Sequence, residues 1–161
     1  MRLTIWRLLT IMLVALSMGT ALCHLLEMPA KLRYEGPTWL MLLQTLYPPG
    51  FGSIGAAFEV GAVLATLVLA FLVRHRRPAF AWTLVGAVCV AAAHAAFWLW
   101  VAPVNETMVP LTPESLPANW TSLRNQWEYT HAGRALLQIL GLAFLAYSVL
   151  IEVDDRRNSH G

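Results

Sequence analysis

The chain has 161 residues, of which 58% are hydrophobic and only 12% are charged, and its mean hydropathy is +0.58. Ordinary soluble domains carry about 25% charged residues, so the composition excludes them and indicates an integral membrane protein. The net charge of +2 is small and the basic residues lie in short clusters beside apolar runs, which does not support nucleic-acid binding.

Four apolar segments are long enough to cross a hydrocarbon core of about 30 Å, which takes roughly 20 helical residues. They are predicted at residues 5–28, 52–73, 80–101 and 127–153. We therefore expect one all-α domain over residues 1–161, a transmembrane four-helix bundle with two ordered outer loops. The first segment has a second interpretation as a secretory signal, because it has a basic start and small residues near its end. Against that interpretation, the apolar run continues past Cys23 through His24 to Leu26.

Basic residues predict the orientation of the bundle in the cell inner or plasma membrane. By the positive-inside rule, both termini and the turn at residues 74–78 are cytoplasmic. The connections at residues 29–50 and 102–126 then face outward, and their prolines and aromatics predict caps over the bundle mouth. The flanking arginines are Arg2, Arg7, Arg74, Arg76, Arg77, Arg156 and Arg157.

Smaller features of the chain carry four further expectations. Residues 38–46 are predicted to form a short interfacial helix, with Trp39 and Tyr47 at headgroup level. Cys23 and Cys89 have no close spacing and are expected to be small buried residues. His75 and His160 lie among polar residues and are expected to be solvated. Small residues are expected to let the helices approach closely, namely Gly55, Ala56, Ala57, Ala91, Ala92, Ala93, Ala132 and Gly133.

Six ionisable side chains of metal-ligand type lie inside the predicted spans, all toward the outer end. A charge at the centre of a membrane helix costs about 2.5 to 3.5 kcal/mol on insertion scales, so several at one depth indicate a site. At 1.5 Å per residue, the first three spans bring such a side chain to roughly 22 to 26 Å above the cytoplasmic arginines. The six residues are His24, Glu27, Glu59, His94, Glu128 and His131.

The spacing of these residues resembles the ligand pattern of four-helix di-iron proteins. His24 and Glu27 are separated by three positions, as are Glu128 and His131, so each pair lies on one helix face. Di-iron bundles use Glu-x-x-His on two helices and single glutamates on two more, whereas here the first pair is reversed and His94 replaces a carboxylate. Mixed imidazole and carboxylate ligation predicts a transition metal, iron first, with manganese or zinc as alternatives. The same residues also fit interhelical ion pairs, with Glu27 or Glu128 bound to Arg134 or Lys31.

The fourth span carries a continuous polar stripe. Trp127, His131, Arg134 and Gln138 recur at steps of four, three and four, with Glu128 beside them, so this face is expected to point inward. Arg134 has two interpretations, one as a cation that holds an anionic ligand and one as a partner of Glu27 or Glu128. The candidate catalytic residues are His131, Glu128 and Arg134.

At these positions the chain resembles the anthrone-oxygenase-like family of small four-span membrane proteins. The resemblance covers nearly the whole chain and is carried by HLLEMPAK at residues 24–31, by Pro103, Val104 and Asn105, and by WEYTHAGR at residues 127–134. It implies oxygenation of a reduced polycyclic phenol to a quinone. It leaves the cofactor open, because anthrone reacts with oxygen once it is deprotonated. The candidate substrate-binding residues are Trp127, Trp98, Asn105, Lys31 and Gln138, and Phe97 and Trp100 are expected beside Trp98 in the cavity wall.

These observations leave three functions open. The first is a membrane-embedded, metal-dependent oxidoreductase or oxygenase that takes an apolar phenolic or quinone-like substrate from the bilayer. The second replaces the metal by haem held between His24, His94 or His131. The third is a non-catalytic membrane subunit or small transporter with a buried ion-pair network. The expected partners are the lipid bilayer and an apolar small molecule, with a homo-oligomer or a membrane complex left open.

Overall fold

The computed structural model describes residues 2–158, with side chains described for residues 2–152. Over this part of the chain every regular element is a helix. Four helical stretches are long and apolar enough to cross a membrane, namely Arg2–Lys31, Gly36–Leu72, Ala79–Met108 and Trp120–Glu152. The prediction of an all-α integral membrane protein with four spans is confirmed. His160 and the arginines at 156 and 157 lie outside the described side chains.

The second and third spans are composite, because each contains a π-helical turn. The elements in chain order are α1 (Arg2–Lys31), α2 (Gly36–Thr45), α3 (Tyr47–Pro49), η1 (Gly50–Gly55), α4 (Ala56–Leu72), α5 (Ala79–Ala96), η2 (Phe97–Val101), α6 (Ala102–Met108), η3 (Pro113–Ser115) and α7 (Trp120–Asn158). The π-helical turns η1 and η2 lie next to α4 and α5, at the ends of the spans predicted from hydropathy. α2 and α6 extend those two spans beyond the predicted limits.

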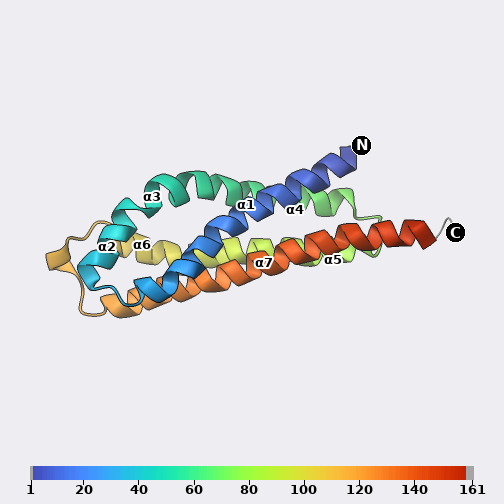
Figure 1. Ribbon diagram of the computed structural model, residues 1–161. Coiled ribbons are helices and arrows are strands. Elements are labelled where there is room, and N and C mark those ends of the chain that lie inside the picture. The colour runs from blue at the N-terminus through green and yellow to red at the C-terminus, as the bar shows by residue number, and fades with distance from the viewer. Residues whose placement is uncertain (1, 159–161) are drawn as a thin grey trace.

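The four long helices run side by side along the long axis of the molecule (Figure 1). Each packs against two neighbours, in the ring α1–α4–α5–α7–α1. The two ends of the chain and the α4–α5 turn lie together at one end, which we call the terminal end (Figure 1). α2 and α6 lie at the opposite end, which we call the cap end.

Glycine permits the closest approach between α5 and α7. A Cβ added at Gly86 would lie 2.9 Å from Leu145 Cγ and 3.0 Å from the Gly141 carbonyl oxygen. Membrane helices gain little from hydrophobic burial against one another, so such small residues favour van der Waals packing of backbones. The prediction that Gly133 lies in a close helix contact is wrong, because a Cβ there would meet nothing within 4 Å.

At the terminal end a single carboxylate joins three parts of the chain. The buried Glu152 of α7 accepts hydrogen bonds from Arg7 of α1 and, at 2.8 Å, from Arg76 of the α4–α5 turn. Charge-assisted bonds of this kind are stronger than neutral ones. Midway along the bundle, Ser17 donates to Gln138 at 3.1 Å, which confirms that the polar stripe of α7 faces inward.

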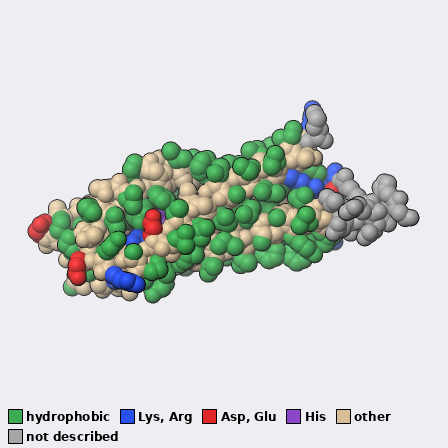
Figure 2. Space-filling model, in the orientation of Figure 1, with side chains coloured by type: hydrophobic (Ala, Val, Ile, Leu, Met, Phe, Trp, Pro, Cys, Tyr) green, Lys and Arg blue, Asp and Glu red, His purple; other side chains and the backbone are tan. Residues whose placement is uncertain are grey.

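The cap end has its own apolar core, built by α2 and α3 against η2, α6 and the start of α7. Trp39 and Tyr47 are buried in this core, and their expected position at headgroup level stays a prediction. The short helix itself is confirmed, as α2. Cys23 is exposed rather than buried, which corrects another expectation. Exposed hydrophobic side chains lie along the length of the bundle on the face shown in Figure 2, and the charged side chains on that face lie mainly toward its two ends.

Candidate functional site

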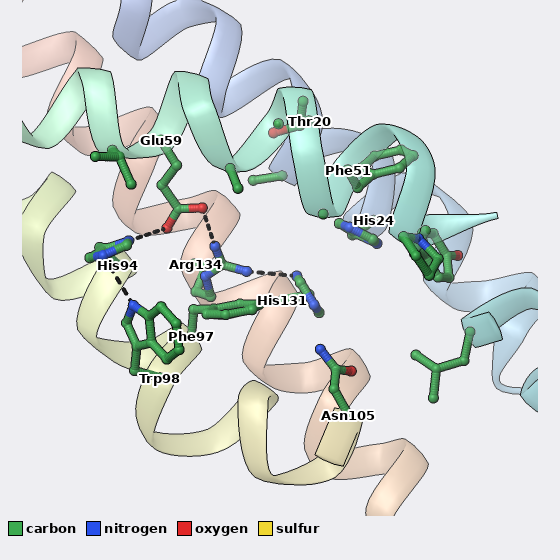
Figure 3. A pocket seen from close by; sticks show the side chains of 18 of the residues that line it. Thr20, His24, Phe51, Glu59, His94, Phe97, Trp98, Asn105, His131 and Arg134 are labelled. Atoms are coloured by element: carbon green, nitrogen blue, oxygen red, sulfur yellow. Dashed lines mark hydrogen bonds and ion pairs between the residues drawn. The ribbon is translucent and has the colours of Figure 1, made fainter. Parts of the chain in front are cut away.

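A cavity of about 510 Å³ lies at the cap end between the four spans (Figure 3). Its floor and walls combine small residues, aromatic rings and ionisable groups. The lining residues are Thr20, Ala21, His24, Leu43, Tyr47, Pro48, Phe51, Gly52, Gly55, Ala56, Glu59, Val60, His94, Phe97, Trp98, Asn105, Val109, His131 and Arg134. Within the described residues, nine helical elements contribute lining residues, namely α1, α2, α3, η1, α4, α5, η2, α6 and α7.

Arg134 stands at the centre of the polar wall (Figure 3). Its guanidinium donates to Glu59 Oε2 at 2.6 Å, to His131 Nδ1 at 2.9 Å and to the Ala93 carbonyl oxygen at 3.0 Å. The Ala93 carbonyl also accepts the Phe97 N–H. The Arg134 bond thus falls on the carbonyl one turn before Phe97, where α5 gives way to η2.

His94 has both ring nitrogens occupied. The indole N–H of Trp98 is a donor only, so His94 Nε2 accepts it at 3.1 Å. The ring proton of the neutral imidazole therefore lies on Nδ1, which donates to Glu59 Oε1 at 3.2 Å. Glu59 is thus held between an imidazole and a guanidinium, and its charge is matched by that of Arg134. Trp98 is 61% exposed on the lipid-facing side, so this chain of bonds runs from the surface into the cavity.

His24 and His131 form the second polar element of the wall. Their ring centroids are 4.1 Å apart, and they are 5% and 4% exposed. Since a guanidinium only donates, His131 Nδ1 is an acceptor and the ring proton lies on Nε2. His131 Nε2 and His24 Nδ1 are both buried and have no hydrogen-bond partner within the described side chains. Buried polar atoms are normally satisfied, so these two nitrogens require a partner that the chain does not supply.

A second ionic cluster lies beside the cavity, and its charged side chains do not line it. The ammonium of Lys31 is 2.9 Å from Glu128 Oε2 and 3.7 Å from Glu27 Oε2. Glu128 also accepts the Trp39 indole N–H at 3.0 Å, and Glu27 accepts the Tyr47 hydroxyl at 2.9 Å. We call these five residues the lysine cluster. It ties α2 and α3 to α1 and α7, so it fixes the cap over the cavity.

The structure divides the predicted site residues between these two places. The cavity receives His24, Glu59, His94, His131, Arg134, Trp98 and Asn105, and also Phe97. The lysine cluster receives Glu27, Glu128 and Lys31, while Trp127 packs between the two, with its ring 4.1 Å from that of His131. Gln138 lies deeper, bound to Ser17. Trp100 is half exposed and lies outside the lining.

The arrangement does not fit the predicted metal ligand set. Each of the three carboxylates is bound to a cation, either Arg134 or Lys31, and both nitrogens of His94 are engaged. In the side chains described, no group of three or more His, Cys, Asp or Glu is placed to hold a metal ion. The rings of His24 and His131 are tilted by 31° with their centroids 4.1 Å apart, which is too close for a haem macrocycle to lie between them. The metal site therefore stays a prediction from the sequence.

Among the cavity residues that were not predicted as site residues are two aromatics, Tyr47 and Phe51. Tyr47 and Phe51 pack on the His24 ring, with centroids 4.8 and 4.7 Å away. Both belong to the stretch YPPGF, where proline and glycine were interpreted as part of an outer connection. The signal was the pair of aromatics four positions apart, which α3 and η1 place on one face.

Comparison with protein-family models, with curated proteins and with solved structures finds no match to this chain. The resemblance to the anthrone-oxygenase-like family accordingly stays a prediction carried by the residue strings quoted above.

Proposed function

We propose that this chain is a membrane-embedded oxidoreductase of the oxygenase type that acts on an apolar phenolic or quinone-like molecule. The observation that carries the proposal is the cavity wall in which the buried nitrogens of His24 and His131 have no partner in the described side chains. The membrane orientation predicted from the arginines places this cavity toward the outer face.

The walls of the cavity suit a flat, largely apolar ring system. Phe51, Phe97, Tyr47 and Trp98 supply aromatic surface, and the volume lies within the range of about 300 to 1,000 Å³ typical of small-molecule sites. Gly52, Gly55 and Ala56 leave open space on the η1–α4 side. A ring molecule dissolved in the bilayer would reach this space without crossing water.

The polar side of the cavity supplies an imidazole base. It also supplies a cation that stabilises the negative charge left on the substrate when the base removes a proton. His131 Nε2 already carries its ring proton, so His24 Nδ1 is the unpartnered imidazole nitrogen that can accept one. We therefore assign proton removal from the substrate to His24 rather than to Glu128, which is bound to Lys31 and Trp39. Removal of that proton leaves an oxyanion on a phenol or on an activated ring ketone. Arg134, acting through His131, stabilises that negative charge electrostatically.

The overall reaction needs no separate reductant. When a ring methylene is oxidised to a carbonyl, one atom of O₂ enters the product and the other leaves as water with the two methylene hydrogens. The chain's contribution is to bind the ring, exclude water and hold the proton at His24. General-base catalysis of this kind is typically worth about 10²- to 10⁴-fold in rate.

The test is oxygen consumption and quinone formation from a hydroxylated anthrone by the protein purified in mild detergent. The wild-type protein is expected to exceed the detergent blank, and His24→Phe to lower the rate at least about 100-fold. His75→Phe is the matched control, because His75 is exposed at the terminal end. A wild-type rate of quinone formation equal to that of the detergent blank would contradict the proposed function.

A second candidate function, a non-catalytic membrane subunit, is favoured by the paired carboxylates. Here Lys31, Arg134 and their partners serve only to hold the bundle together. That function predicts no turnover with any ring substrate, and a partner protein that is lost when the cap is loosened by Trp39→Phe. Co-purification from the native membrane measures the loss of that partner, when the wild-type protein is compared with Trp39→Phe.

A further inference from the structure

We infer that the cavity contains an oxygen-acceptor site, formed by the Nε2–H of His131 and the side-chain amide of Asn105, that selects ring molecules carrying a carbonyl oxygen. The inference rests on the proposed function in one respect, namely that the cavity binds an apolar ring. Beyond that, the bound ring molecule carries a carbonyl group, and the end with the carbonyl oxygen faces α7.

The first donor is set by the contact between His131 and Arg134. Nδ1 of His131 lies 2.9 Å from a guanidinium nitrogen, which has only donors, so Nδ1 accepts and Nε2 carries the proton. His131 is 4% exposed, and Nε2 meets no acceptor in the described part of the chain. A buried N–H without an acceptor is destabilising, and a bound oxygen atom that accepts it removes that cost.

The second donor is set by Trp127. Its indole N–H donates to Asn105 Oδ1 at 2.8 Å, so the amide oxygen is turned toward Trp127 and the amide nitrogen away from it. Figure 3 shows that nitrogen pointing across the cavity toward the His131 ring. Asn105 lies on α6, while Trp127 and His131 lie on α7, four residues apart and therefore on one face. Trp127 is thus a positioning residue that acts through Asn105.

Two donors aimed at one region define the chemistry of the group that occupies it. A carbonyl oxygen has two lone pairs and accepts both N–H groups. A hydrocarbon of the same shape leaves both donors unpaired, and an amine or ammonium places donors against donors. A site built to hydrogen-bond a ligand rejects an analogue that lacks the matching atom more strongly than an apolar pocket rejects a change of size.

The test compares 9-fluorenone with fluorene, which share one flat tricyclic frame and differ in a carbonyl oxygen. Binding of each is measured by calorimetry to the protein in one detergent, for the wild type, Asn105→Asp, Trp127→Phe and Trp100→Phe. Asn105→Asp keeps the shape and the Trp127 bond but removes the amide donor. Trp100→Phe is the matched control, since Trp100 lies outside the cavity lining. The ratio of the two affinities, compared between proteins, cancels partition into the detergent.

We expect the fluorenone-to-fluorene ratio to fall roughly five- to tenfold in Asn105→Asp and in Trp127→Phe, and to stay unchanged in Trp100→Phe. A merely structural role of Trp127 would weaken both ligands equally and leave the ratio unchanged. As a second measurement, the infrared C=O stretch of fluorenone is expected to move to lower frequency on binding to the wild-type protein.

The outcomes separate the two proposals. If both ligands bind and the ratio is the same in every protein, with no infrared shift, the oxygen-acceptor site is wrong while a cavity for apolar rings remains. If neither ligand binds the wild-type protein, both the cavity function and the acceptor site are overturned.

Discussion

The ammonium of Lys31 lies 2.9 Å from the carboxylate of Glu128, and the two side chains are 2% and 0% exposed. The pair joins α1 to α7 where water does not reach. The rings of Tyr47 and Trp127 surround the ammonium at 5.1 and 4.7 Å, which adds cation–π attraction. A charge in such a place depends on its partner, because solvent cannot replace it.

Removing that ammonium is expected to destabilise the fold. Lys31→Met leaves Glu128 buried and uncompensated, at a cost of about 3 to 5 kcal/mol in the free energy of unfolding. Unfolding by a denaturing detergent, followed by circular dichroism, measures the change. The control is Arg33→Met, because Arg33 is an exposed basic residue two positions along the chain. It should change the free energy of unfolding very little. The double variant Lys31→Met with Glu128→Gln should recover part of the loss, and a double variant as unstable as the sum of its parts would contradict the pairing.

Neutralising Glu59 is expected to lower both the stability of the fold and the rate of quinone formation. Glu59→Gln leaves the Arg134 cation without a counter-charge and costs about 3 kcal/mol, at the low end for a buried pair because Glu59 retains some exposure. The same change should lower the rate of quinone formation, since Arg134 would no longer hold His131 in place. Glu106→Gln, on the exposed side of α6, is the control for both measurements. A Glu59→Gln protein with wild-type stability and rate would show that the Arg134 contact has no role.

Alanine substitutions are expected to distinguish the packing glycines from the others. Gly86→Ala forces a methyl group against Leu145 and the Gly141 carbonyl, and overpacking of this kind costs about 1 to 3 kcal/mol. Gly133→Ala meets nothing within 4 Å and should stabilise α7 by about 0.5 to 1 kcal/mol, because alanine is the better helix former. Thermal unfolding in one detergent compares them. Opposite signs are the expected result, and equal effects would argue against a close α5–α7 contact.

Elemental analysis tests the metal site predicted from the sequence. Because the three carboxylates are bound to Lys31 and Arg134, we expect protein purified in mild detergent to carry well below one equivalent of any transition metal. Treatment with a chelator should then leave the melting temperature and the rate of quinone formation unchanged. One equivalent of iron that is lost together with activity would mean that Glu59 leaves Arg134 to become a ligand.

The four apolar spans and the gathering of polar residues at one end of the bundle could be predicted from the sequence, because both follow from simple constraints. Apolar length identifies the spans, and the cost of a buried charge makes His24, Glu59, His94 and His131 face one another rather than lipid. The helical period likewise placed Gln138 on the inward face of α7.

Partner choice could not be predicted in the same way. The sequence offered both Arg134 and Lys31 as partners of Glu27 or Glu128. The structure confirms Lys31, which is paired with both carboxylates, but pairs Arg134 with Glu59 instead. The difference arises from the lateral order of the helices and from side-chain direction, neither of which height along a helix determines. The cap was harder still, since proline and glycine in residues 47–52 predict a turn and not a helical wall of the cavity.

The Glu152 carboxylate has a consequence for how a molecule enters. Arg7 and Arg76 converge on it at the terminal end, far from the cavity, and so fasten α1, α7 and the α4–α5 turn at a common point. At the other end, the glycines of η1 and the exposed ring of Trp98 border the space between α4 and α5. We therefore expect any separation of the helices that admits a ring molecule to occur at the cap end, because these ion pairs hold the terminal end together.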